Sequence, residues 1–272
     1  MPQASSLKPQ ACLTLTTDFG SSSPYVAAMK GVILSLAPEA RVVDLTHAVP
    51  AQDIRHAAIV LDEVTPWFPP GTLHVVVVDP GVGSDRRIVY ARIGHQQYLA
   101  PDNGVLSRLA RRVSPSTIIH VARPEYWLPV VSATFHGRDI FAPVAARLAL
   151  GLKPEALGER LAELVTLDWS EADVARGKIE GKIELIDSFG NLVSNITSEQ
   201  LADCPRNELV TVECDEHETQ GIFRTYADQP EMTLIALVGS SGKLELAIVG
   251  ESAAIMLGIR PGTPITVRWP VG

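Results

Sequence analysis

The sequence predicts an α/β N-terminal domain with a mainly parallel sheet, followed by a smaller all-β, barrel-like C-terminal domain. Up to about residue 165, apolar runs of strand length alternate with amphipathic helical patterns, which is typical of a layered α/β structure. After residue 177 only short alternating strands remain, separated by turns rich in Gly, Ser and Pro. We therefore expect domains at residues 1–168 and 169–272, with the boundary in the polar stretch at 166–178.

The first domain begins with two short buried strands, Leu13–Thr17 and Arg41–Leu45, on either side of a helix. That helix, Pro24–Leu36, has serines before it that can cap it, a proline suited to its first turn and another proline just beyond its end. Asp53–Val64 repeats its apolar residues on one helical face and is expected to be a second helix.

The run Leu73–Val78 is apolar throughout, as a central parallel strand covered on both faces should be. Three further helices are expected, at Asn103–Arg112, Arg138–Leu150 and Glu155–Leu164. The strands expected in the second domain are Lys182–Ile186, Leu192–Asn195, Leu209–Glu213, Gly221–Tyr226, Thr233–Val238, Lys243–Ile248 and Pro264–Trp269.

Composition narrows the classes of partner. With 46% apolar and 20% charged residues the chain has ample material for a core, and its net charge of −8 disfavours nucleic acid, which needs clustered Lys and Arg. The 3 cysteines lie far apart and indicate neither a disulfide framework nor a zinc site. The polar N-terminus lacks the apolar core of a signal peptide, and no run is long enough to span a membrane. We expect a cytoplasmic protein.

Three short polar motifs separate the apolar runs: Asp79-Pro-Gly-Val-Gly-Ser-Asp-Arg86, Pro101-Asp-Asn-Gly104 and Thr134-Phe-His-Gly-Arg-Asp139. The first directly follows the apolar strand, and ligands collect at the carboxyl ends of strands in open α/β sheets. Asp79 is therefore a candidate for chemistry. A plain β-turn, with Asp79 capping a helix or pairing with Arg86, is the alternative interpretation.

Several common sites are disfavoured by spacing. Arg86 stands where the third glycine of a dinucleotide-binding fingerprint belongs, and Gly239–Lys243 is too short for a Walker loop. There is no Gly-x-Ser-x-Gly elbow, and no two histidines have the spacing of a catalytic zinc helix. We expect no metal and no cofactor.

The motifs occur in an order that resembles one family. The matching segments are Thr17–Gly20, Val43–His47, Asp79–Ser84, Pro101–Gly104, Thr134–Asp139, Asp187–Asn191 and Ser240–Gly242. From about residue 13 to 269 the chain resembles the S-adenosylmethionine hydrolases, also called S-adenosylmethionine hydroxide adenosyltransferases, which are relatives of fluorinase and chlorinase. That family combines an N-terminal α/β domain with a C-terminal β-barrel, in agreement with the division above.

The resemblance implies cleavage of S-adenosylmethionine to adenosine and L-methionine, with water or hydroxide attacking C5′ of the ribose. It places a catalytic triad on Asp79, Arg86 and His136. His136, with an unperturbed pKa near 6.5, is a natural group to accept the water's proton, and Arg86 would lower the pKa of that water as a fixed cation. Asp79 could orient both. Which of the three moves the proton stays open at this point.

The resemblance also assigns substrate contacts. It gives the ribose hydroxyls to Asp18 and the methionine ammonium to Asp187, while Phe189 and Asn191 flank the nucleoside. Ser240 and Ser241 would bind the methionine carboxylate or nearby groups, and Glu245 would face adenine. The halogenases have an arginine where Ser241 stands, so the partner of the carboxylate is open.

Other motif residues have structural interpretations. Asp102 and Asn103 suit the turn into the next helix, and Asp139 suits the positive end of a helix dipole. His47 either caps the strand before it or lines the site.

Two alternatives remain from the sequence. A halogenase is disfavoured because the halogenases have a tyrosine where Asp79 stands, lack the equivalent of His136, and carry an insertion before Pro-x-Asn-Gly that is absent between Arg87 and Pro101 here. A non-catalytic protein that binds adenosine or S-adenosylmethionine is the other alternative. The resemblance further implies a homotrimer, with sites between the N-terminal domain of one subunit and the C-terminal domain of its neighbour.

Overall fold

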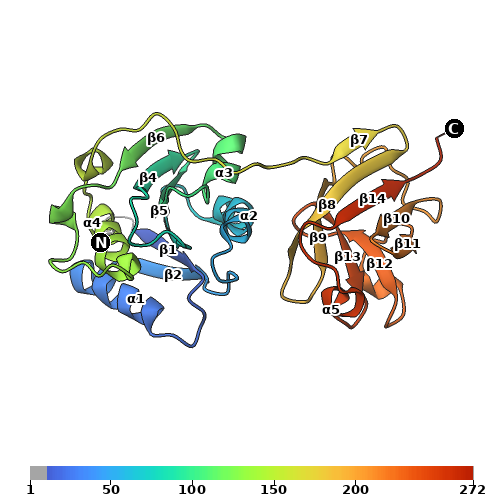
Figure 1. Cartoon of the computed structure of the whole chain (residues 1–272), viewed down its shortest axis with the longest axis horizontal. Coiled ribbons are helices and arrows are strands. Elements are labelled where there is room, and N and C mark those ends of the chain that lie inside the picture. Colours follow the sequence, from blue (N-terminus) through green and yellow to red (C-terminus); the bar gives the residue numbers. More distant parts are fainter. Residues whose placement is uncertain (1–10, 272) are drawn as a thin grey trace, which may run out of the picture. The chain divides into compact units, whose positions relative to one another are not determined.

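The computed structural model describes residues 11–271 (Figure 1). The chain folds into two compact units, one ending at Asp168 and the other beginning at Trp169. Each unit has its own hydrophobic core. Among the described residues, no helix has the length and apolar character needed to cross a membrane.

The first unit is built on a mixed, mostly parallel sheet. Within the described residues its strands are β1 (Cys12–Thr17), β2 (Arg41–Thr46), β3 (Leu73–Val77), β4 (Ile88–Ile93), β5 (Gln96–Pro101) and β6 (Pro115–His120), in the order β2-β1-β3-β5-β4-β6. Strands β2, β1, β3 and β5 are parallel, and β4 is antiparallel to both β5 and β6. The predicted mainly parallel sheet is confirmed.

Helices cover both faces of this sheet (Figure 1). On one face lie α1 (Tyr25–Leu36) and α4 (Ala142–Ala149), and on the other α2 (Ile54–Val64) and α3 (Ser107–Arg112). Strand β3 serves both layers because its side chains alternate: Val75 and Val77 pack with α1 and α4, whereas Val76 packs with α2 and α3. The uniformly apolar sequence of β3 follows from this double burial.

Three of these strands, β4, β5 and β6, were not expected from the sequence, and one expected helix is wrong. Glu155–Leu164 forms only a 3₁₀ turn, η4 (Pro154–Leu157), before the chain becomes extended. Gly158 has a φ of +156°, and a Cβ there would lie 2.1 Å from the carbonyl oxygen of His120. The chain then hydrogen-bonds to the edge of β6 through the Glu159 carbonyl and the Leu161 amide, which takes the place of helical bonding.

The helices that flank the third polar motif and the second also begin later than expected. Asn103–Leu106 forms turns, and α3 starts at Ser107. A π-helical turn, η3 (Gly137–Phe141), precedes α4. Such turns are frequent at functional sites.

The second unit is an antiparallel, nearly closed β-barrel. Its described strands are β7 (Asp173–Ala175), β8 (Lys178–Ile186), β9 (Leu192–Thr197), β10 (Thr211–Cys214), β11 (His217–Gln220), β12 (Leu234–Val238), β13 (Lys243–Ile248) and β14 (Pro264–Arg268). They run in the order β11-β10-β14-β8-β9-β13-β12, with β7 paired to β8. The Thr219 hydroxyl donates to the Leu234 carbonyl at 2.8 Å and so links the two end strands, β11 and β12. The predicted barrel-like domain is confirmed.

The expected strand Gly221–Tyr226 is wrong. Only Phe223 makes an isolated bridge, to Leu237, and the chain then forms a 3₁₀ turn, η5 (Tyr226–Asp228). A reciprocal capping box between Thr225 and Asp228 stabilises that turn. Strand β11 and the short helix α5 (Ala253–Leu257) were not foreseen; α5 is capped by the Ser252 side chain.

Candidate functional site

Two carboxylates follow neighbouring parallel strands of the first unit. Asp18 comes directly after β1, and Asp79 follows β3 with only Val78 between them. Thr17 and Val77 are paired in the parallel register, so the two carboxylates leave the sheet at the same edge. Both line one cavity of about 340 Å³ at that edge.

Asp79, Arg86 and His136 form a connected cluster. Arg86 Nε donates to both carboxylate oxygens of Asp79, at 3.0 and 2.9 Å, and Nη2 donates to Oδ2 at 2.6 Å. The same Nη2 lies 2.7 Å from His136 Nδ1. The side chains of Asp79 and Arg86 are only 3% and 12% exposed, which makes this a largely buried, charge-assisted pair. The structure therefore brings together the three residues that the resemblance assigns to the triad.

The arginine fixes the tautomer of His136. A guanidinium can only donate, so Nδ1 must accept, and the neutral ring then carries its proton on Nε2. Burial and the Arg86 charge lower the pKa of His136, while Asp79 and Asp139 oppose that shift. His136 is consequently a neutral ring with an N–H on the side away from Arg86.

The neighbouring arginine has a different partner. Arg87 pairs with Asp102, whose other oxygen accepts from the Val165 amide at 2.8 Å. Asn103 donates to the Val78 carbonyl at 3.0 Å and holds the turn after β5 against the end of β3. These contacts make Asp102 and Asn103 part of the scaffold and leave Arg86 as the arginine of the cluster.

The loops that carry Asp79 and His136 pack directly on each other. Gly83 has a φ of +80°, and a Cβ there would lie 2.4 Å from the Ala133 carbonyl oxygen, so only glycine permits this approach. Asp139 is fully buried and accepts from the Ser132 amide and from Arg138, which anchors the second loop. Burial works to raise the pKa of Asp139, but the hydrogen bonds from Arg138 and Ser132 lower it.

The cavity beside the cluster has one polar and one aromatic wall. Asp18 accepts from the Gln52 amide at 2.8 Å, and Gln52 holds a left-handed φ of +64°. Phe19, Tyr25 and Phe135 pack against one another with ring centroids 5.0–6.0 Å apart, and all three line the cavity. His47 is not among the lining residues; it contacts Thr17 and Asp44 instead.

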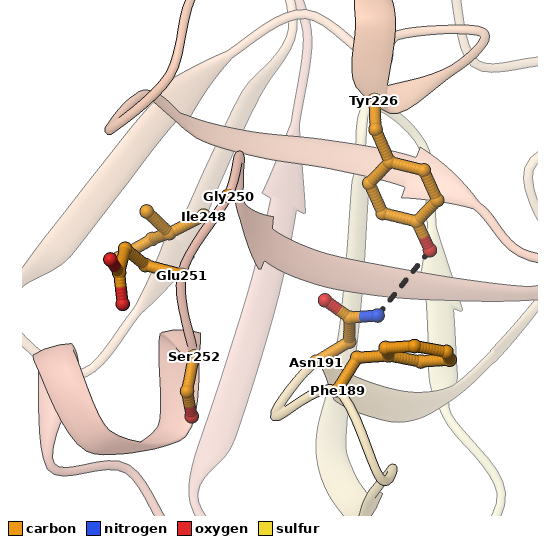
Figure 2. Close-up of a pocket in the computed structure, with 7 residues that line it drawn as sticks. All are labelled: Phe189, Asn191, Tyr226, Ile248, Gly250, Glu251 and Ser252. Atoms are coloured by element: carbon orange, nitrogen blue, oxygen red, sulfur yellow. Dashed lines mark hydrogen bonds between the residues drawn. The ribbon is translucent and has the colours of Figure 1, made fainter.

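The second unit contains the other predicted residues. Asp187 accepts from the backbone amides of Phe189 and Asn191, at 2.9 and 2.8 Å, and from the Asn191 side chain at 2.9 Å. Phe189 is 78% exposed, and with Asn191 it lines a cavity of about 480 Å³ (Figure 2). Tyr226, Ile248, Gly250, Glu251 and Ser252 complete the lining.

Tyr226 is a residue of this cavity that the sequence did not indicate. Its hydroxyl donates to Glu245 and lies 3.4 Å from the Asn191 amide nitrogen. Glu245 itself is buried and is not among the residues that line the cavity. Burial and then Glu245 raise the pKa of Tyr226 above its usual range.

Ser240 and Ser241 stand apart from this cavity. Both are exposed in the turn between β12 and β13 and neither lines either cavity. Within residues 11–271, no group of three or more His, Cys, Asp or Glu side chains is arranged to hold a metal ion.

The first unit carries polar loops and an Asp–Arg–His cluster at the carboxyl edge of its sheet, and a β-barrel follows it. These features define a class of two-unit enzyme, and comparison with known proteins identifies that class. Residues 13–158 match the SAM hydroxide adenosyltransferase N-terminal domain, and residues 181–266 match the corresponding C-terminal domain. The chain belongs to the SAM hydroxide adenosyltransferase family.

Known relatives agree with this assignment. An (R)-S-adenosyl-L-methionine hydrolase of Thermus thermophilus is 40% identical over 92% of this chain and 96% of its own. A fluorinase of Nocardia brasiliensis is 27% identical over 94% of this chain and 96% of its own. A crystal structure of an uncharacterized conserved protein from Thermotoga maritima superposes with a TM-score of 0.89 at 34% identity, over 94% of this chain and 99% of that one.

Proposed function

We propose that this protein hydrolyses S-adenosyl-L-methionine, as the (R)-S-adenosyl-L-methionine hydrolases that it resembles are named to do. One observation carries the hydrolytic chemistry: the closed contact of Asp79, Arg86 and His136 beside a cavity that also contains Asp18. That cluster offers one acceptor and one donor to a single water molecule.

Asp79 is the acceptor. Its carboxylate lines the cavity, and Oδ1, which accepts only from Arg86 Nε, keeps a lone pair for a further donor. A water that donates one O–H to Asp79 and accepts from the Nε2–H of His136 has its remaining lone pair free to face C5′. The resulting placement of the nucleophile can supply several kcal/mol of the barrier reduction.

The bond changes balance within this arrangement. The water oxygen forms a bond to C5′ as the C5′–S bond breaks, and the electron pair of that bond leaves on sulfur as a neutral thioether, the side chain of methionine. The water's proton passes to Asp79 and then to solvent. Arg86 remains a cation throughout and favours the developing hydroxide-like oxygen. His136 donates in this scheme and does not act as the base.

The substrate contacts follow the same division. Asp18, held by the Gln52 amide, is proposed to accept from the ribose hydroxyls. The cavity at Phe189 and Asn191 is proposed to take the nucleobase, with Asp187 near the methionine ammonium. Ser240 and Ser241 remain the proposed partners of the methionine carboxylate of the substrate, because both residues are exposed.

We also propose a homotrimer whose sites combine the first unit of one subunit with the second unit of its neighbour. Coexpression tests this directly. His136→Ala and Asn191→Ala variants, each inactive alone, regain activity in mixed oligomers only if a site draws on two chains. Mixed oligomers that stay inactive, or a monomer by light scattering, overturn this part of the proposal.

Incubation with S-adenosylmethionine tests the reaction itself. The proposal predicts adenosine and L-methionine in equal amounts without added metal, above a control lacking enzyme. Chloride or fluoride at high concentration should give no 5′-halo-adenosine. Absence of adenosine after long incubation would remove the hydrolase assignment, and adenosine binding without turnover would establish a binding protein instead.

A further inference from the structure

The side-chain amide of Asn191 is held in one orientation. Asn191 is only 6% exposed, and its Nδ2 donates to Asp187 Oδ2 at 2.9 Å and, at a longer 3.4 Å, to the Tyr226 hydroxyl oxygen. Both N–H groups of the amide are thereby used on one side. Its oxygen lies on the other side: Figure 2 shows it directed away from Tyr226, toward the segment of Ile248 and Gly250.

Two carboxylates dictate this orientation. A carboxylate can only accept, so the atom of Asn191 that faces Asp187 must be the nitrogen. Glu245 likewise can only accept, so Tyr226 must donate to it and can offer Asn191 only a lone pair. Burial and Glu245 raise the pKa of Tyr226, which keeps the phenol protonated as this donor. Asp187 at one end of the network and Glu245 at the other therefore require the same orientation of the Asn191 side-chain amide.

The network is built from fixed parts. Tyr226 opens the turn η5, which the Thr225–Asp228 capping box stabilises. Glu245 is 6% exposed, and a Cβ on Gly239 would lie 2.3 Å from its Oε2, so the glycine makes room for the carboxylate. Asp187 is held by two backbone amides of its own loop. None of these groups can turn without losing buried hydrogen bonds.

We propose that Tyr226 and Glu245, together with Asp187, are positioning residues that present Asn191 Oδ1 to the cavity as a fixed acceptor and thereby make the site select a 6-aminopurine over a 6-oxopurine. This inference rests on the proposed function, in which the cavity takes the nucleobase. An exocyclic amine donates to Oδ1. An exocyclic oxygen would place two acceptors against each other and leave a buried one unpaired.

Nucleoside binding by wild-type protein is the first test, because it needs no variant. Isothermal titration calorimetry with adenosine, inosine and purine riboside should give the tightest Kd for adenosine. The Kd of inosine should be about 10–100-fold weaker, the fold-change expected for one unpaired buried acceptor. Purine riboside, which has neither group, should lie between them.

A double substitution then inverts the network. In Asp187→Asn, the new amide oxygen can keep the two backbone amides and its nitrogen can donate to Asn191 Oδ1. In Glu245→Gln, the new amide can donate to the Tyr226 oxygen, which frees the phenol O–H to donate to Asn191 as well. With both changes, the Asn191 amide turns over and presents Nδ2 to the cavity. The double variant should therefore bind inosine more tightly than adenosine, while each single variant weakens both.

Two further variants control the test. Tyr226→Phe keeps the ring but removes the relay from Glu245, and it should reduce the adenosine preference without reversing it. Glu231→Gln removes the charge of a side chain whose Cγ would lie 3.6 Å from a Cβ at Gly250 but which is not part of the network, and it should leave the preference unchanged.

The outcomes separate this inference from the proposed function. Adenosine and inosine of equal affinity in the wild type, or a double variant that still prefers adenosine, overturn the inference even if S-adenosylmethionine is hydrolysed. A reversed preference in the double variant, together with a wild-type protein that shows no turnover, supports the inference and removes the hydrolase assignment. Failure of every nucleoside to bind contradicts both.

Discussion

Removal of the Arg86 cation should reveal how far the triad is a structural pair and how far it is catalytic machinery. The substitution Arg86→Met leaves the Asp79 carboxylate, 3% exposed, without its three hydrogen bonds from the guanidinium. It also leaves His136 Nδ1 without its donor. An uncompensated buried charge is the main consequence for stability.

The magnitude follows from that burial. Breaking a buried ion pair by removing one partner costs about 3–5 kcal/mol. For a unit of this size each kcal/mol corresponds to about 2–4 °C in Tm, so Arg86→Met should lower Tm by about 6–20 °C. Adding Asp79→Asn removes the stranded charge. The double variant should therefore be more stable than Arg86→Met alone, although it carries one more substitution.

Activity should behave differently from stability. Both the single and the double variant should lose at least about 100-fold in kcat, because both lack the Arg86 cation and the double variant also lacks the Asp79 carboxylate that accepts from the water. Arg87→Met is the matched control: it breaks the neighbouring pair with Asp102, whose side chain is 1% exposed, but leaves the triad intact. It should lower Tm while kcat at a temperature where it is folded stays near that of the wild type.

Calorimetric unfolding and product chromatography on the four proteins provide the assay. The reasoning is refuted if Asp79→Asn fails to restore stability to Arg86→Met, since the carboxylate would then not have been a buried, stranded charge. It is refuted equally if Arg86→Met keeps kcat within tenfold of the wild type.

Four other results are expected. His136→Gln, whose amide can accept from Arg86 and donate to water but cannot act as a base, should retain kcat within about tenfold of the wild type. His136→Ala should lower kcat about 100-fold or more. Equal losses in the two variants would favour His136 as the base. Because burial and Arg86 lower the pKa of His136 below its ordinary 6.5, the neutral ring persists as the pH falls through 6.5, so the acid limb of kcat should lie below that value; a limb centred above 6.5 would contradict the assigned environment. Gly83→Ala, with its Cβ 2.4 Å from the Ala133 carbonyl oxygen, should lower both Tm and kcat. Gly71→Ala, at a φ of +84° with nothing within 4 Å, should lower Tm alone, because backbone strain reduces the free energy of unfolding by roughly 1 kcal/mol. Asp18→Asn should weaken adenosine binding in calorimetry while the triad variants largely keep it; unaltered binding would remove Asp18 from the ribose site.

The sequence predicted those parts of the fold whose pattern is local. Strand β3 is apolar throughout because both its faces are covered, and the carboxylate just beyond it marks the edge of the sheet where Asp79 lies. The turn-rich second half predicted the antiparallel barrel in the same way. Its hairpin turns are short and carry the residues that such turns require.

What the local pattern could not supply depends on contacts between distant segments. Only the family resemblance selected Arg86 over Arg87, because their partners Asp79 and Asp102 become visible only when the strands are side by side. The Glu155–Leu164 segment has helical composition, but Gly158 packs on the backbone of β6. Hydrogen bonds to the edge of β6 therefore replace those of a helix in this segment.

Tyr226 lay in an expected strand, so its place in the cavity could not be read from periodicity. The capping pair Thr225 and Asp228 was the available signal, since it marks the start of a helical turn and not a strand. That turn places the Tyr226 hydroxyl in contact with Asn191, just before β9, and with Glu245 in β13.

The most direct measurement is the fate of solvent oxygen. Turnover of S-adenosylmethionine in water labelled with oxygen-18, followed by mass spectrometry, should place one labelled atom on C5′ of adenosine and none in methionine. Adenosine without the label, or a label found in methionine, would contradict attack by water at that carbon.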